Sequence, residues 1–332
     1  ARVTEPVSYQ AFQHFITHAP WDADRIWRRL LEILPERRGV LIIDGTSFPK
    51  QGDRSVGVAR QYCGALGKIA NCQVATTAAL WTGTHAWLLG GHPVIGPAAR
   101  KVTSKLDLGE SPEGVGRSAD GNWVIVAIEE DNAVFFIDSA TGKIEFKVKT
   151  EGENPEHAVF SPDGKWVYVS AEESQVVDVI DVAARKLAGT IRVGKRPRGI
   201  GFTPDGARAY VACELANTVY AIDVATNKVI ASIPAGVKSN GVKVHPSGKE
   251  VYITNGTDGT VNVIDTTSNK ITHTIKVGQR PWNMALTQDG NKLYVANGRS
   301  NNVSVIDTVA KKKVKDIAVG EMPWGVLIPE GH

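Results

Sequence analysis

A repeat of about 42 residues is the feature that most constrains how this chain can fold. An Ile-Asp pair closes one segment of each repeat, and neighbouring pairs are 43, 42, 42 and 42 residues apart. Repeats of this length are typical of propellers, solenoids and other arrays of one supersecondary unit. The aspartates of the pairs are Asp138, Asp181, Asp223, Asp265 and Asp307.

Each repeat reads as four short strands. An apolar segment follows a proline, a tight turn leads to an alternating segment, and a third segment ends in Ile-Asp. A fourth segment alternates again, as at residues 229–233. Glycine in the turn supplies the positive φ of a tight hairpin. The turn pairs are Asp120-Gly121, Asp163-Gly164, Asp205-Gly206, Ser247-Gly248 and Asp289-Gly290. Four antiparallel strands per repeat predict an all-β fold, a β-propeller of four-stranded blades.

The two ends of the repeat array leave partial blades. Five full repeats span about residues 110–322. Residues 324–328 read as a first strand with nothing after it, and residues 101–108 as a fourth strand with nothing before it. We predict six blades, because a blade built from both termini closes the ring. This closing blade would comprise residues 71–108 and 323–328, with middle strands at 71–80 and 85–89. The alternative is an open arc of five blades, which a second chain closes.

Residues 1–70 differ from the repeats and form a predicted separate segment. Apolar residues recur at helical spacing within residues 8–34, which predicts a short helical cap. Residues 39–44 then predict a short strand that ends in Asp44. The predicted domains are therefore residues 1–70, a helical cap with a strand, and residues 71–332, the propeller.

Composition limits the partners. A net charge of +3 with 22% charged residues favours neither nucleic acid nor an anionic membrane. No apolar run reaches the ~20 residues that span a bilayer, and residue 1 does not begin a signal-peptide pattern. We expect a soluble protein with no nucleic-acid or membrane partner, of open localisation. The three cysteines form no CxxC pair, so we predict neither a disulfide framework nor a zinc site.

Two motifs near the N-terminus resemble a DDE-superfamily insertion-sequence transposase. They are Leu41-Ile42-Ile43-Asp44-Gly45-Thr46 and Gln61-Tyr62-Cys63-Gly64-Ala65-Leu66-Gly67-Lys68, and the resemblance covers about residues 8–75. It implies DNA cleavage by two metal ions held by three carboxylates, with Asp44 as the first. No later segment matches the other two carboxylates, and Gly45 departs from the family pattern. We therefore expect a scaffold or a gene-fusion remnant without transposase activity.

The repeats themselves resemble the YVTN-family β-propellers. Leu293-Tyr294-Val295-Ala296-Asn297 and Val251-Tyr252-Ile253-Thr254-Asn255 carry this resemblance, which covers about residues 100–332. It implies the propeller fold and a periplasmic or secreted ancestry. It does not specify a ligand.

Propellers bind ligands on loops at one mouth of the channel, so we take as candidates the residues that follow the proline at the start of each repeat. These leading prolines are Pro112, Pro155, Pro197, Pro281 and Pro323, and Ser239 takes the place of the proline once. His157 also stands in such a loop, where three of the other four full repeats carry Gly. The predicted ligand-binding residues are Glu113, Glu156, Arg198, Asn240, Trp282, Asn283 and Trp324. They predict a small-molecule ligand or a protein partner at this top face.

A second set of polar residues ends the second strand of each repeat. The set comprises Glu129, Glu172, Glu214, Asn255 and Asn297. Such oxygen-rich side chains suit a divalent cation, Ca²⁺ or Mn²⁺. With His157 and Glu172 as the catalytic residues, the prediction is metal-assisted hydrolysis of a lactone, ester or phosphoester. Alternatively, the glutamates are solvated residues paired with Arg198 or with lysines.

No G-x-S-x-G elbow, P-loop or c-type haem signature is present in the sequence. We therefore favour a ligand-binding or interaction propeller without chemistry of its own over the metal-dependent hydrolase. A homo-oligomer formed through the N-terminal segment is a further expectation.

Overall fold

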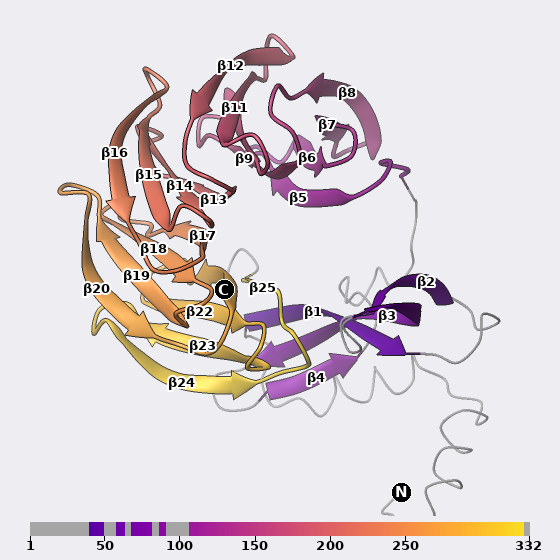
Figure 1. Cartoon of the computed structure of the whole chain (residues 1–332), viewed down its shortest axis with the longest axis vertical. Helices are drawn as coiled ribbons and strands as arrows, with labels where there is room; N and C mark the ends of the chain where they lie inside the picture. The colour runs from indigo at the N-terminus through magenta and orange to yellow at the C-terminus, as the bar shows by residue number, and fades with distance from the viewer. Residues whose placement is uncertain (1–39, 50–57, 64–67, 82–85, 91–105, 329–332) are drawn as a thin grey trace, which may run out of the picture. The chain divides into compact units, whose positions relative to one another are not determined.

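The computed structural model describes residues 40–49, 58–63, 68–81, 86–90 and 106–328, and it describes side chains in the last of these ranges. The regular elements in these ranges are β-strands (Figure 1). The predicted helical cap at residues 8–34 lies outside them. Within the described part of the chain, no helix is long and apolar enough to span a bilayer.

Five four-stranded sheets follow one another along residues 112–318. The first contains β5 (Pro112–Arg117), β6 (Trp123–Ile128), β7 (Ala133–Asp138) and β8 (Lys143–Lys149). The second contains β9 (Pro155–Phe160), β10 (Trp166–Ala171), β11 (Val176–Asp181) and β12 (Lys186–Arg192). The third contains β13 (Pro197–Phe202), β14 (Arg208–Cys213), β15 (Thr218–Asp223) and β16 (Lys228–Pro234). The fourth contains β17 (Ser239–Val244), β18 (Glu250–Asn255), β19 (Thr260–Asp265) and β20 (Lys270–Lys276). The fifth contains β21 (Pro281–Leu286), β22 (Lys292–Asn297), β23 (Asn302–Asp307) and β24 (Lys312–Ala318).

Each of these sheets is an antiparallel meander in which strands pair in chain order. In the second sheet, for example, Tyr168 lies opposite Val159 of the first strand and Val179 of the third. The predicted all-β fold and its four-stranded, propeller-type blades are confirmed for the five full repeats. The number of blades in a closed ring stays a prediction.

Two side-chain-capped turns explain why the repeat folds this way. Between the first two strands, Gly164 has φ +70°, and Ser161 Oγ donates to Asp163 at 2.6 Å. Between the last two strands, Asp223 accepts the backbone N–H of Thr226 at 2.8 Å. These bonds stabilise the ionised carboxylate, and the pKa of Asp223 is lowered chiefly by its bonds to Thr226. The recurring Asp residues therefore serve turns.

Apolar clusters between successive sheets form the core. Tyr168, Tyr210 and Tyr252 are fully buried at equivalent positions of three sheets. The hydroxyl of Tyr210 donates to Asn269 Oδ1 of the next sheet at 3.0 Å. Tyr168 and Tyr252 make comparable contacts with Asn227 and Lys311, so three junctions combine apolar packing with a polar contact between neighbouring blades.

A further sheet joins the C-terminus to the N-terminal region. It contains β1 (Val40–Pro49), β2 (Val58–Cys63), β3 (Lys68–Trp81), β4 (Ala86–Gly90) and β25 (Gly325–Leu327). β25 pairs with β1, β1 pairs with β3, and β3 pairs with both β2 and β4. The two middle strands predicted at residues 71–80 and 85–89 are present as β3 and β4. The predicted closing blade did not include residues 40–49, but in the structure β1 lies between β25 and β3. Asp44 lies on β1 opposite Thr77.

The strand predicted at residues 101–108 is only partly covered by the described residues. Residues 101–105 of the predicted strand at 101–108 lie outside the described residues, and residues 106–108 are not in a strand.

Candidate ligand-binding site

The first strands of the five sheets lie side by side at the inner edges of the blades. A Cβ added at Gly199 would lie 2.6 Å from the carbonyl oxygen of Asn240 on the next first strand. Only glycine permits this approach. The second residue of each first strand is therefore placed beside its equivalents in neighbouring blades. These residues are Glu113, Glu156, Arg198, Asn240 and Trp282.

Arg198 is the centre of an ion-pair network at this site. Its guanidinium contacts Glu156, and it lies 3.0 Å from Glu172 Oε2. Its Nε donates to Glu214 Oε2 at 3.1 Å. The three carboxylates are almost buried, and they come from two successive blades. One planar guanidinium with several donors can hold all three.

Arg196 and Arg280 extend the network. Arg196 contacts Glu172, and its Nε lies 3.5 Å from Glu214 Oε2, too far for a hydrogen bond. Arg280 Nη2 lies 3.3 Å from Glu214 Oε1. Three arginines and three glutamates therefore meet at one site, which we call the Arg–Glu network: Arg196, Arg198, Arg280, Glu156, Glu172 and Glu214.

Burial shifts several ionisation equilibria here. It is the first cause of the raised pKa of Glu172, which Arg196 opposes. It also raises the pKa of Glu113, with a further contribution from Glu129. Burial lowers the pKa of Arg198, against the attraction of Glu214. Partly desolvated charges therefore dominate this mouth.

His157 lies beside the network as a neutral side chain. Burial lowers its pKa to about 4, so the imidazole is uncharged at neutral pH. Its Nδ1 lies 3.8 Å from Glu156 Oε1 and has no hydrogen-bond partner. His157 can therefore offer an unused polar atom to a ligand, but it is a weak base.

Two glycines leave space for the side chains of Arg280 and Trp282. In the fourth and fifth repeats, Gly256 and Gly298 replace the glutamates of the earlier repeats. A Cβ at Gly256 would lie 3.2 Å from Arg280 Nη1, and one at Gly298 would lie 2.8 Å from Trp282 Cζ3. Arg280 also stacks over the Trp282 ring, 5.5 Å from its centroid. The absence of a side chain at Gly256 thus leaves space for Arg280 beside Glu214.

The predicted cation ligands do not fit a metal site in this structure. Glu172 and Glu214 are paired with arginines, and Glu129 accepts a bond from Asn154 Nδ2 at 2.8 Å. The amides of Asn255 and Asn297 donate within their own blades. Within residues 106–328, no three His, Cys, Asp or Glu side chains form a group able to hold a metal ion. Arginines occupy the carboxylates that a cation would require.

The other predicted residues are not members of the Arg–Glu network, although Arg280 stacks over Trp282. Asn240 is nearly buried, and Trp324 is half exposed. The backbone N–H of Asn283 donates to the carbonyl oxygen of Trp324 at 3.4 Å. Sequence reasoning missed Arg196 and Arg280, which precede two of the leading prolines. The sequence pattern that could have identified them is the Arg-Pro pair at the start of two repeats, together with three glutamates that require positively charged partners.

A small hollow borders the network. Its volume is about 140 Å³, and its lining residues are Glu172, Glu173, Gln175, Lys195, Arg196 and Leu215. It can accept a carboxylate-sized group. Lys195 and Arg196 supply the cationic part of its wall.

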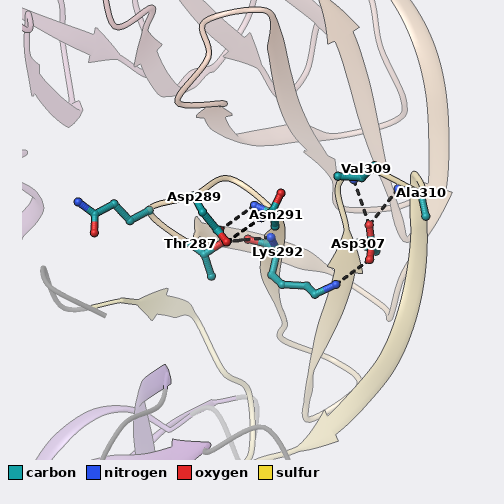
Figure 2. A pocket seen from close by; sticks show the side chains of 8 residues that line it. Thr287, Asp289, Asn291, Lys292, Asp307, Val309 and Ala310 are labelled. Atoms are coloured by element: carbon teal, nitrogen blue, oxygen red, sulfur yellow. Dashed lines mark hydrogen bonds and ion pairs between the residues drawn. The ribbon is translucent and has the colours of Figure 1, made fainter.

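A larger, open hollow of about 1050 Å³ lies at the turns of the fifth sheet (Figure 2). Its polar groups already serve those turns. Asp289 accepts bonds from Thr287 Oγ1 and Asn291 Nδ2, and Lys292 Nζ lies 2.6 Å from Asp307. Equivalent turn bonds occur in other sheets, so this hollow is a weaker candidate than the mouth.

Comparison with known proteins identifies the repeat region. A family model described as "Lactonase, 7-bladed beta-propeller" matches residues 99–189 and 186–320, together more than half of the chain. The chain belongs to this lactonase family. The predicted propeller is thus confirmed as lactonase-type, and five of its sheets are complete within the described residues.

The region that precedes the lactonase-type propeller is transposase-like. A DDE superfamily endonuclease model matches residues 1–105. A probable transposase for insertion sequence element IS701 from Microchaete diplosiphon is 37% identical over 81 residues, which are 23% of this chain and 21% of that protein. The chain thus spans about a fifth of this relative's length.

A solved structure shares the fold of the lactonase-type propeller. Kuenenia stuttgartiensis hydrazine synthase aligns with a TM-score of 0.51 at 20% identity, over 69% of this chain and 94% of that chain. At this identity the likeness concerns the fold alone.

Proposed function

We propose that the protein is a binding propeller that holds a small hydroxy-carboxylate at the Arg–Glu network. The observation that carries this proposal is the meeting of three arginines with three nearly buried glutamates from successive blades. Charges taken out of water are expensive, and apolar residues at such positions often stabilise a fold better. Clusters of perturbed ionisable groups are characteristic of functional sites.

The donor set supports a carboxylate as the bound group. Guanidinium forks match carboxylates in geometry. Arg196 Nε has no hydrogen-bond partner, and Lys195 lines the same 140 Å³ hollow. The family description names a lactonase, and opening a lactone yields a hydroxy-carboxylate. We therefore assign this chemical class to the ligand.

Titration calorimetry with gluconate tests the proposal. We expect gluconate to bind the full chain, and Arg196→Gln to weaken binding at least tenfold. Arg192→Gln is the matched control, because Arg192 is exposed at the end of β12 in the same blade junction. Absence of gluconate binding, or equal affinity in both variants, contradicts the proposal.

Hydrolysis is a second candidate function, favoured by the family description. His157 and Glu172 lie beside the same network, and the neutral imidazole is the form that accepts a proton. The predicted metal ligands do not fit a cation, so we derive no step through a metal. Hydrolysis of gluconolactone, measured with and without a chelator, is the assay. A rate that is unchanged in His157→Ala and Glu172→Gln variants contradicts this candidate.

A further inference from the structure

Each junction between successive complete sheets is filled by side chains from both. At the first junction, Phe136 and Val148 pack with Ala158 and Val169. The next three junctions follow the same arrangement. An apolar sheet face is stable when a neighbouring layer covers it.

The two ends of the array lack such a complete neighbour among the described residues. Tyr294 and Val305 of the fifth sheet pack with Val326 and Ile328, at the C-terminus. On the free face of the first sheet, Leu108 is the described residue from outside that sheet that packs against the cluster.

Val115 lies on the face of the first sheet that no complete neighbouring sheet covers among the described residues. Its side chain is 69% exposed, whereas the equivalent Ala158, Ile200 and Met284 are 2%, 6% and 7% exposed. In the other sheets the preceding blade covers this position. The first sheet therefore presents an apolar face of the kind that another blade covers.

The sheet that contains β25 has the strand positions of a blade. β25 follows Pro323, as first strands follow their leading prolines, and β1, β3 and then β2 or β4 come next in order. β25 attaches this sheet to the fifth sheet. The 15 residues between Gly90 and Leu106 connect it covalently to the first sheet, and a segment of this length reaches up to roughly 50 Å.

We propose that β25, β1, β3, β2 and β4 form a sixth blade whose free face covers Val115, so that one chain closes its own ring. The transposase-like segment then supplies every strand of that blade except the first. A covalent tether favours this occupant over a second copy, because it holds the segment at an effective concentration of about millimolar.

Thiol reactivity tests the closure. Val115→Cys is placed in a full-length Cys63→Ser/Cys72→Ser background. Cys213 stays silent, because it is fully buried and burial raises the pKa of its thiol to about 12. Val309→Cys is the matched control, since Val309 is 78% exposed on a turn of the fifth sheet. We expect Val115→Cys to react at least tenfold more slowly than Val309→Cys, and equal rates overturn the proposal.

Two further measurements keep the result unambiguous. Light scattering over a range of dilutions should show a monomer. The thiol of Val115→Cys should react equally slowly at every dilution. A slow thiol reaction that is seen only in dimers overturns the proposal in favour of a second copy.

If the variant without Cys63 and Cys72 does not fold, hydrogen exchange of the wild-type chain replaces the thiol measurement. Amides of β5 should then exchange as slowly as those of β9, and exchange a hundredfold faster in β5 contradicts closure.

Discussion

Asp178 is a buried carboxylate whose environment is unfavourable to its charge. It is fully buried, and its Oδ2 accepts the backbone N–H of Gly152 at 2.9 Å, while Oδ1 has no partner. Burial raises its pKa from 3.8 to about 6. Because the pKa is higher in the folded state, the ionised carboxylate destabilises the fold above pH about 6, and this penalty disappears below pH about 4.

In the fourth sheet an uncharged amide occupies the position that is equivalent to Asp178. Asn262, at the equivalent position, accepts from Gly236 and donates to Thr274 Oγ1 at 2.9 Å. Thr190 stands opposite Asp178 as Thr274 stands opposite Asn262. We expect Asp178→Asn to raise the free energy of unfolding at pH 8 by about 2 kcal/mol.

Urea unfolding at pH 8 and pH 4 measures this effect. At pH 4 the difference between Asp178→Asn and wild type should be close to zero. Adding Thr190→Val should remove part of the gain at pH 8, because the amide loses its acceptor. A gain of equal size at both pH values contradicts the assignment of the penalty to ionisation.

At the scale of the elements, glycines decide how closely the first strands approach. A Cβ at Gly199 would lie within 3.2 Å of three backbone atoms of β17, whereas one at Gly189 would have nothing within 4 Å. We expect Gly199→Ala to lower the free energy of unfolding by about 2 kcal/mol or more, and Gly189→Ala by less than about 0.5 kcal/mol. Urea unfolding compares the two, and equal effects contradict the proposed close packing of these strands.

The strands were predictable because each repeat carries its own local signals. Ser161, Asp163 and Gly164 bond within one turn, so their spacing alone indicates a hairpin. The Arg–Glu network was only partly predictable, since Arg280 reaches Glu214 across 66 residues of sequence. The glutamates and Arg198 were identified, but Arg196 and Arg280 were not, and Arg280 belongs to a different blade from its partner Glu214. Cation binding at these glutamates stays a prediction, and in this structure arginines pair with Glu172 and Glu214.

At the scale of the whole molecule, the transposase-like region and the lactonase-type propeller share a sheet through β1 and β25. If this region completes the ring, it is required for folding. We expect a chain without residues 1–98 to aggregate or to unfold at lower temperature, because it exposes sheet edges and apolar faces. Light scattering and circular dichroism measure the outcome. A soluble, folded monomer contradicts the required role.

The proposed binding of a ligand at the Arg–Glu network can be tested directly by hydrogen exchange. The measurement compares the full chain with and without gluconate. Binding at the Arg–Glu network predicts slower exchange in residues 152–157, 194–199 and 213–216, with no change at the turns 287–292 of the fifth sheet. No protection in the three mouth segments, or protection confined to those turns, would contradict the account.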